Sequence, residues 1–250
     1  MTNRLRTWLG RDHVTLEGTI LPPREMRPGG PAFSDDRYFL SSALAEADRL
    51  VSTLGLVKTT RVLDIGCGAG RLAIGILRQV GDIRMYHGVD VDERPVAWCQ
   101  RYIERSHPSF RFALLDVENP RYNPSGRPLT SGFRFPFPGQ SFDIVYLYSV
   151  FSHMLEKDVR LYLNEFRRLL ASSGKMFFTA FAEKHVPNVS VNPDGYRREW
   201  SGPLHCVRYD MEFLRSLLSD AGFAVDRFDY ATEIDGQTAF YASITLAPMA

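Results

Sequence analysis

The segment VLDIGCGAGRLA, residues 62–73, constrains the fold of this chain more than any other stretch. A short apolar run leads into glycines in a G-x-G-x-G pattern, and apolar residues at helical spacing follow directly. A strand, a glycine turn and a helix in this order are typical of an α/β fold that binds a ligand at the turn. The dinucleotide fingerprint G-x-G-x-x-G would place its last glycine at position 71, where this chain has Arg71. The spacing therefore disfavours NAD and FAD.

The alternation of strand and helix patterns continues along the chain. Apolar runs predict strands at 61–65, 85–91, 110–117, 142–150, 175–182, 224–231 and 238–247. Helical spacing predicts helices at 35–56, 70–80, 94–106, 156–170 and 210–222, with Gly174 as the glycine that closes the fourth. This order predicts a Rossmann-like, doubly wound α/β fold. We expect a seven-stranded, mostly parallel sheet with an antiparallel strand in a C-terminal hairpin.

Three segments rich in turn-forming residues interrupt this pattern within what we expect to be one domain, residues 1–250. Residues 1–34 predict an irregular N-terminal arm, and residues 118–141 and 183–209 predict long loops. Connections of this length in a compact domain are usually functional or disordered.

The composition narrows the class of protein. The net charge is +1, from 30 basic and 29 acidic side chains, which gives no electrostatic footprint for nucleic acid. The three cysteines share no metal-ligand spacing, so we expect neither a metal site nor a disulfide framework. No secretory segment and no apolar run of membrane-spanning length is present. We expect a cytoplasmic protein with no membrane partner; the oligomeric state stays open.

Carboxylates follow the first three strands of the predicted sheet. Asp90 comes about 20 residues after the glycine turn, where an acid can bind ribose hydroxyls. Asp116 is placed to accept a hydrogen bond from an exocyclic amine, and Asp64 to hold the loop or a ligand ammonium. Each acid alone is more often a solvated strand end. Together, on one rim of a parallel sheet, they indicate a site for a nucleoside ligand.

The ordered motifs VLDIGCGAG, GVDV, LLDV, FPFPGQSFDIVYLYSVFSHM and EFRRLLASSGKMFFTAF resemble those of class I S-adenosylmethionine-dependent methyltransferases. More narrowly, SVFSHML and LPPREMRPGG are similar to a bacterial small-molecule group that often carries SVFTHL at the fourth strand. The resemblance implies S-adenosylmethionine as cofactor and S-adenosylhomocysteine as product. The cofactor contacts that it implies are Arg27, Asp64, Gly66, Cys67, Gly68, Gly70, Arg71, Asp90, Val91, Asp116, Val117, Tyr148 and Ser149.

Methyl transfer to oxygen or nitrogen can require a base, and a histidine suits that task. His153 in SVFSHM is the leading candidate, although a packing role at that position is about equally common; His205 is a weaker candidate. The segment 183–209 should cover the substrate. Its expected pocket residues are His185, Tyr196, Trp200 and Tyr209.

The sequence says least about the molecule that accepts the methyl group. The fourth strand ends in LYSVF, whereas the resemblance ties an Asn/Asp-Pro-Pro-Tyr/Phe motif to methylation of nucleobase amines. We therefore expect a small-molecule acceptor, methylated at a hydroxyl oxygen of a sugar or secondary metabolite. A methyltransferase acting on a macromolecule and a non-catalytic cofactor-binding relative are the alternatives.

Overall fold

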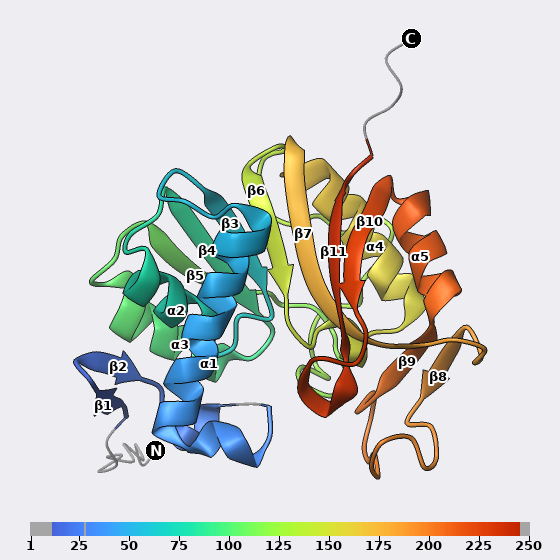
Figure 1. The fold of residues 1–250 in the computed structure, drawn as a ribbon, viewed down its shortest axis with the longest axis horizontal. Coiled ribbons are helices and arrows are strands. Elements are labelled where there is room, and N and C mark those ends of the chain that lie inside the picture. The colour runs from blue at the N-terminus through green and yellow to red at the C-terminus, as the bar shows by residue number, and fades with distance from the viewer. Residues whose placement is uncertain (1–11, 28, 246–250) are drawn as a thin grey trace, which may run out of the picture.

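The computed structural model describes residues 12–27 and 29–245 (Figure 1). Its centre is a sheet whose main path runs in the order β10-β11-β7-β6-β3-β4-β5. Five of these strands are parallel: β3 (Arg61–Ile65), β4 (Met85–Asp90), β5 (Phe110–Leu114), β6 (Phe142–Leu147) and β7 (Leu170–Glu183). The strand β11 (Thr238–Ile244) is antiparallel to both β7 and β10 (Phe223–Asp229). The predicted seven-stranded Rossmann-like sheet is confirmed.

Helices cover both faces of this sheet (Figure 1). One face buries a core shared by α1 (Asp36–Arg49), α2 (Arg71–Gln79) and α3 (Glu93–Cys99). The other buries a core shared by α4 (Glu156–Leu169) and α5 (Met211–Asp220). Single π-type turns, Leu50–Leu54 and Gln100–Glu104, extend α1 and α3. Local signals set the helix ends: Asp35 caps α1 by accepting from the backbone N–H of Tyr38 at 2.8 Å, and Asp210 caps α5.

The α1 and α2 helices pack unusually closely at Gly75. A Cβ atom added there would lie 2.0 Å from the carbonyl oxygen of Ala43. No side chain fits that gap, so the missing side chain allows the backbone of α2 to approach α1. This contact fixes the helix that begins directly after the glycine turn.

The fifth parallel strand differs from the sequence prediction. The α4 helix ends at Leu169 and β7 begins with the next residue, so Gly174 lies inside the strand and closes no helix. The register of β7 against β6 shifts between Leu170 and Lys175, which marks an irregularity in the strand. The predicted glycine cap is wrong because the residues after Leu169 pair with β6, a contact that the local sequence pattern does not show.

The segment 183–209 is also more ordered than predicted. It contains β8 (Val189–Val191) and β9 (Val207–Asp210), which pair antiparallel to each other. Because β9 pairs in parallel with the last residues of β7, this unit extends the central sheet to nine strands. The long strand β7 thus carries the segment past the edge at which β3, β4 and β6 end (Figure 1).

The N-terminal arm is partly regular. In its described part, β1 (Val14–Leu16) and β2 (Thr19–Leu21) form a hairpin, followed by 3-10 turns at Arg24–Met26 and Pro31–Ser34. Residues 1–11 of the predicted arm lie outside the described residues. Further 3-10 turns lie at Phe151–His153 and Ile234–Gly236. Within residues 12–27 and 29–245, no helix combines the length and the apolar character needed to cross a bilayer.

The loop 118–141 is anchored on α4. Phe135 is buried, and its backbone N–H donates to the Glu165 carboxylate at 2.9 Å. Arg168 donates to the carbonyl oxygens of Phe135 and Phe137. The aromatic residues in the second half of the loop therefore belong to the core, and its first residues remain available to a site.

Candidate active site

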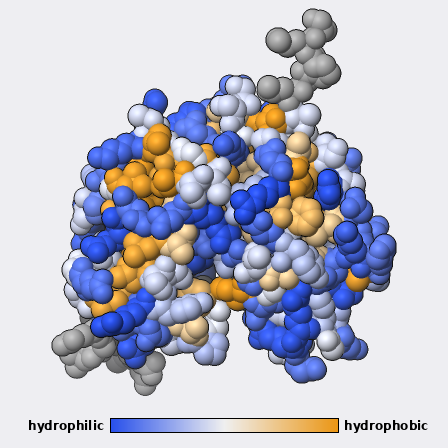
Figure 2. Space-filling view, in the orientation of Figure 1, coloured by the Kyte–Doolittle hydropathy of each residue, from blue (hydrophilic) through white to orange (hydrophobic). Residues whose placement is uncertain are grey.

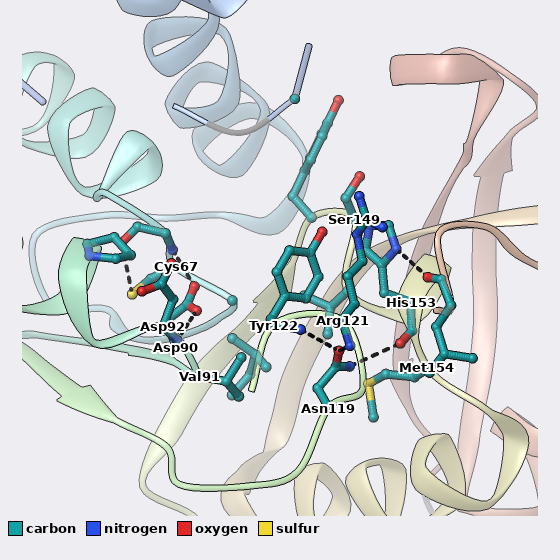
Figure 3. A pocket seen from close by; sticks show the side chains of 18 of the residues that line it. Cys67, Asp90, Val91, Asp92, Asn119, Arg121, Tyr122, Ser149, His153 and Met154 are labelled. Carbon is teal, nitrogen blue, oxygen red and sulfur yellow. Dashed lines mark hydrogen bonds between the residues drawn. The ribbon is translucent and has the colours of Figure 1, made fainter. Parts of the chain in front are cut away.

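A cavity of about 650 Å³ lies at the carboxyl ends of β3, β4 and β6 (Figure 3). Its size lies within the ~300–1,000 Å³ usual for small-molecule sites. Parts of the N-terminal arm, the loop 118–122 and the segment 198–205 complete its walls. The outer surface is correspondingly hollowed between the N-terminal arm and the β8–β9 region (Figure 2).

The glycine turn forms one wall of the cavity. Gly66 and Gly68 have φ values of 72° and 48°, in the left-handed region. A Cβ on Gly66 would lie 2.6 Å from a methyl carbon of Val150, so a larger residue has no room. The backbone N–H of Gly66 donates to the carbonyl of Val89 at 2.8 Å, which ties the turn to the end of β4. Glycine is needed here because these left-handed φ values are unfavourable for other residues. As a result, the turn presents backbone without side chains to the cavity.

Asp90 supports that turn and faces the same cavity. Its Oδ2 accepts from the backbone N–H of Gly68 at 2.7 Å, and its Oδ1 accepts from that of Asp92 at 3.0 Å. Figure 3 shows Cys67, Asp90, Val91 and Asp92 gathered at this end. Burial raises the pKa of Asp90, while the two backbone N–H groups oppose the rise. Each oxygen keeps lone pairs that a ligand hydroxyl can use.

Asp64 lies beneath the turn and is almost fully buried. The hydroxyl of Tyr86 donates to its Oδ2. Burial raises the pKa of Asp64 to about 7, because a desolvated carboxylate is disfavoured. A cation bound nearby would favour the ionised form of Asp64.

Arg71 lines the cavity between two aromatic rings. Its guanidinium carbon lies 4.5 Å from the centroid of the Tyr148 ring and 5.6 Å from that of Phe33. Its nearest carboxylate is that of Glu46, at 3.7 Å. The hydroxyl of Tyr148 donates to Glu233 at 3.1 Å. Arg71 is therefore held by rings and a buried acid at the end of β6.

Ser149 and Arg27 also line the cavity, with their polar groups engaged elsewhere. Ser149 has a φ of 57°, its N–H donates to Thr179, and its hydroxyl accepts from Gln237 at 2.6 Å. The Arg27 guanidinium donates to the carbonyl of Pro22 and pairs with Asp36 at 2.8 Å. The arm residue thus braces the wall of the cavity.

His153 stands opposite the glycine turn. Its Nδ1 lies 2.9 Å from the carbonyl oxygen of Leu204. That oxygen can only accept, so Nδ1 carries the proton and Nε2 keeps a lone pair. Burial, with a smaller contribution from the charge of Arg121, lowers the pKa of His153 to about 4. The imidazole is therefore neutral at pH 7 and can accept a proton or hydrogen bond at Nε2.

The segment 183–209 brings some of its predicted residues to the cavity. Trp200 and His205 line it, with ring centroids 5.1 Å apart. Burial lowers the pKa of His205, and its Nδ1 lies 2.9 Å from the carbonyl of Ser201. Tyr196 lies outside the lining and donates its hydroxyl to Glu183 at 2.8 Å. His185 also lies outside the lining, at a turn position with a φ of 60°.

Two further predicted positions also lie outside the lining of the cavity. Tyr209 is fully buried, and its hydroxyl donates to the carbonyl of Met154, so it belongs to the core beneath the cavity. Asp116 lies two residues past the end of β5, pairs with Arg127 at 3.2 Å on the surface, and does not line the cavity. Val117, the next residue, does line it. Alternation of side chains at the strand end turns Val117 inward and Asp116 outward.

Gly70 does not line the cavity; it lies at the N-terminal end of α2, packed against Ile103 and Cys99. It begins α2 with a φ of 76°, and a Cβ there would lie 2.7 Å from Ile103 and 3.1 Å from Cys99. Of the remaining predicted cofactor positions, Cys67, Arg71 and Val91 line the cavity.

Sequence reasoning missed the residues on the loop that follows Val117. Asn119, Arg121 and Tyr122 line the cavity next to His153. Oδ1 of Asn119 accepts from the backbone N–H groups of Arg121 and Tyr122, and its Nδ2 donates to the carbonyl of His153 at 3.2 Å (Figure 3). The Asn-Pro pair at 119–120 is a turn signal that could have singled out this loop.

No group of three or more His, Cys, Asp or Glu residues in the described ranges has an arrangement that could hold a metal ion. The three cysteines are free and buried.

Comparisons with known sequences connect this cavity to one family. A family model described as a methyltransferase domain matches residues 36–227. The chain is 27% identical over 139 residues to the ubiquinone biosynthesis O-methyltransferase of Bradyrhizobium diazoefficiens, covering 56% of this chain and 47% of that protein. It is 25% identical over 142 residues to an uncharacterized methyltransferase of Schizosaccharomyces pombe, covering 57% and 46%. The chain spans about half the length of these curated relatives.

Solved structures share the fold. A 1,6-didemethyltoxoflavin-N1-methyltransferase of Burkholderia thailandensis matches with a TM-score of 0.57 and 20% identity, covering 84% of this chain and 82% of that one. The magnesium protoporphyrin IX methyltransferase of Synechocystis matches with a TM-score of 0.57 and 17% identity, covering 89% and 90%. The family model extends over more than half of the sequence. The chain therefore belongs to the methyltransferase-domain family, as a class I S-adenosylmethionine-dependent methyltransferase domain.

Proposed function

We propose that this protein methylates a hydroxyl oxygen of a small molecule, a sugar or another secondary metabolite. The observation that carries the proposal is one cavity shared by the glycine turn with Asp90 on one side and the unprotonated Nε2 of His153 on the other. A site for the methyl donor and a proton acceptor thus line the same cavity.

The residues at the turn fit S-adenosylmethionine. Gly66 and Gly68 have left-handed φ values and no side chains, so the turn lines the cavity with backbone, and Asp90 has free lone pairs for ribose hydroxyls. Asp64 supplies a buried carboxylate beneath a cationic ligand. We assign Val91 and Val117 to the walls around the adenine, and Tyr148 and Ser149 to the end near the sulfonium.

When bound, the cofactor supplies an activated methyl carbon on a sulfonium. The protein must then orient the acceptor and exclude water. We assign to His153 the proton of the acceptor hydroxyl, which passes to Nε2 as the oxygen forms its bond to carbon. The carbonyl of Leu204 fixes the tautomer that makes this transfer possible. His205, whose Nδ1 faces the Ser201 carbonyl, is the weaker candidate.

The walls of the cavity favour a small acceptor. Gly30 and Phe33 of the arm and residues 198–205 line the cavity together with the loop 118–122, which limits its volume to about 650 Å³. We propose that residues 1–250 form one methyltransferase domain and that 183–209 covers the substrate. The relative from Bradyrhizobium is named an O-methyltransferase, and the resemblance of SVFSHM to the SVFTHL motif supports a small-molecule acceptor. The buried free thiols support a reducing compartment such as the cytoplasm.

Calorimetry with S-adenosylhomocysteine and with NAD tests the donor half of the proposal. We expect saturable binding of the first and none of the second. For the acceptor half, the protein is incubated with methyl-deuterated S-adenosylmethionine and a panel of hydroxylated metabolites, and products are identified by mass spectrometry. A label found on RNA, DNA or protein in place of small hydroxyl compounds would favour the macromolecular alternative.

A further inference from the structure

Arg121 stands out among the charged residues of the cavity. Its Nε is buried and has no hydrogen-bond partner in the described part of the chain. Its guanidinium makes no ion pair with a carboxylate of residues 12–27 or 29–245; its neighbour is the Tyr122 ring, 5.4 Å from the guanidinium carbon. Because protein atoms cover Nε, a ligand in the cavity meets the terminal Nη groups of Arg121, which also make no hydrogen bond in the described part of the chain.

The other arginines of the cavity differ from Arg121. Arg27 pairs with Asp36 at 2.8 Å, Arg71 lies 3.7 Å from Glu46, and Arg198 pairs with Asp235 at 2.9 Å. Arg94 is exposed at the start of α3, on the cofactor side. Arg121 therefore combines three features. It lies in the part of the cavity next to His153, which we call the acceptor half; it has a buried polar atom; and no carboxylate of the described residues compensates its charge.

The loop places Arg121 accurately next to the proposed base. Asn119 bonds the backbone of Arg121 and also the carbonyl of His153, so the two residues are fixed to one anchor (Figure 3). On the other side, Nη1 of Arg121 lies 3.9 Å from the position that a Cβ of Gly202 would occupy. Arg121 thus spans the space between the loop 118–122 and the covering segment.

We propose that the acceptor is a planar hydroxy acid whose carboxylate binds Arg121 while its hydroxyl meets Nε2 of His153. This inference rests on the proposed function and names its substrate class. A guanidinium presents a planar fork that matches a carboxylate. The rings of Tyr122 and Trp200 line the same half and supply flat apolar walls for a planar body.

The charge balance selects a carboxylate over a phosphate monoester. Burial lowers the pKa of both His153 and His205, so both rings are neutral at pH 7. Arg198 is compensated by Asp235. The lining also includes the carboxylates of Glu118 and Asp158, which make no ion pair within the described residues, so a dianionic phosphate is disfavoured more strongly than a monoanion beside the single free guanidinium of Arg121.

Matched acid and amide probes test this inference on the intact protein saturated with S-adenosylhomocysteine. Calorimetry compares 2-, 3- and 4-hydroxybenzoate with the three corresponding hydroxybenzamides, which keep the shape and hydroxyl but lack the charge. We expect at least one acid to bind at least about tenfold more tightly than its amide. R121Q should remove that preference and R121K should restore part of it, while R215Q, on the exposed face of α5, should keep it.

The outcomes separate this inference from the proposed function. Wild-type protein that binds S-adenosylhomocysteine but prefers no acid over its amide would overturn the inference alone, as would an undiminished preference in R121Q. Failure of the wild type to bind S-adenosylhomocysteine would instead remove the proposed function. Unchanged affinity of R121Q for S-adenosylhomocysteine shows that the variant is folded.

Discussion

At the scale of single residues, the proposed proton transfer depends on which nitrogen of His153 is free. The carbonyl of Leu204 accepts a hydrogen bond from Nδ1–H, and burial keeps the ring neutral. A neutral imidazole with a pKa near 4 is a weaker base than one with a pKa near 7, so His153 can take the proton only as the new bond forms and makes the hydroxyl more acidic. The same residue in solution would be a mixture of tautomers and partly protonated.

The first prediction concerns this protonation state. In nitrogen-edited NMR spectra, His153 should show the Nδ1–H tautomer at pH 7 and should protonate with a midpoint near pH 4, because burial opposes the charged ring. The spectrum of H153Q assigns the signal. A midpoint near the ordinary value of about 6.5 would contradict the buried position described here.

The second prediction compares two acids that the sequence treats alike. D90A should weaken S-adenosylhomocysteine binding at least about tenfold, since charge-assisted hydrogen bonds contribute roughly 1.5–3 kcal/mol each. D116A is the matched control: its carboxylate lies outside the cavity and pairs with Arg127, so the affinity should stay within about twofold. Calorimetry measures both. A loss in D116A equal to that in D90A would place Asp116 back at the site.

These two acids show what the sequence can specify. Asp90 is held by backbone groups close to it in the fold, at a strand end that the local pattern identifies correctly. The side of the chain to which Asp116 points depends on where β5 ends, and pairing with β4 decides that. Arg121 was missed because it stands out only by having no hydrogen-bond or ion-pair partner within the described residues. A local sequence pattern cannot show which partners a side chain has in the folded protein.

At the scale of elements, the segment that covers the cavity is built separately from the cofactor turn. Its tip, 193–203, leaves β8 at Asn192, and the N–H of Asn192 donates to the carbonyl of Cys206 at 2.7 Å. The two ends of the tip therefore lie close together. Short strands of three or four residues such as β8 and β9 carry too weak a pattern to be predicted, which is why the sequence indicated only a loop.

The third prediction removes that tip. Replacing 193–203 with a short glycine linker keeps β8, β9 and Leu204, so S-adenosylhomocysteine should bind within about an order of magnitude of wild type. Methyl transfer to an acceptor found in the screen should fall at least about 100-fold, because Trp200 no longer shapes the pocket. Calorimetry and mass spectrometry measure the two effects. Full turnover in the shortened protein would locate the acceptor elsewhere.

The fourth prediction concerns the contact between α1 and α2. G75A should lower the free energy of unfolding by about 3 kcal/mol or more, because the new methyl group collides with the backbone carbonyl of Ala43. G132A is the control, since a Cβ there meets nothing closer than 3.8 Å, and should change stability by less than about 0.5 kcal/mol. Urea denaturation followed by circular dichroism distinguishes the two. Equal stability of both variants would be inconsistent with the close helix packing.

At the scale of the whole molecule, two buried groups make stability depend on pH in opposite directions. Burial raises the pKa of Asp64 to about 7, so its contribution to stability is complete below about pH 4 and is lost as pH rises through 7. Burial lowers the pKa of His153 to about 4, so stability falls as pH drops from about 6.5 to 4. At pH 7 and above, the protein without ligand should therefore be destabilised by Asp64, the carboxylate that we assign to the ligand site.

The fifth prediction isolates Asp64. Between pH 5 and pH 8, the free energy of unfolding of D64N minus that of wild type should rise by about 2 kcal/mol, because the amide never has to ionise in the core. His153 cancels in this difference. The same variant should bind S-adenosylhomocysteine more weakly, since it lacks the carboxylate that we assign to the ligand ammonium. A difference that does not change with pH would show that Asp64 titrates normally.

The strand β7 runs on beyond the edge where its parallel neighbours stop, and β9 joins it only there. Chain joined at this overhang can vary in length without breaking a hydrogen bond between the strands that carry the glycine turn and Asp90. The overhang is therefore the point at which protein engineering can exchange the segment between β7 and β9 and keep the parallel sheet intact.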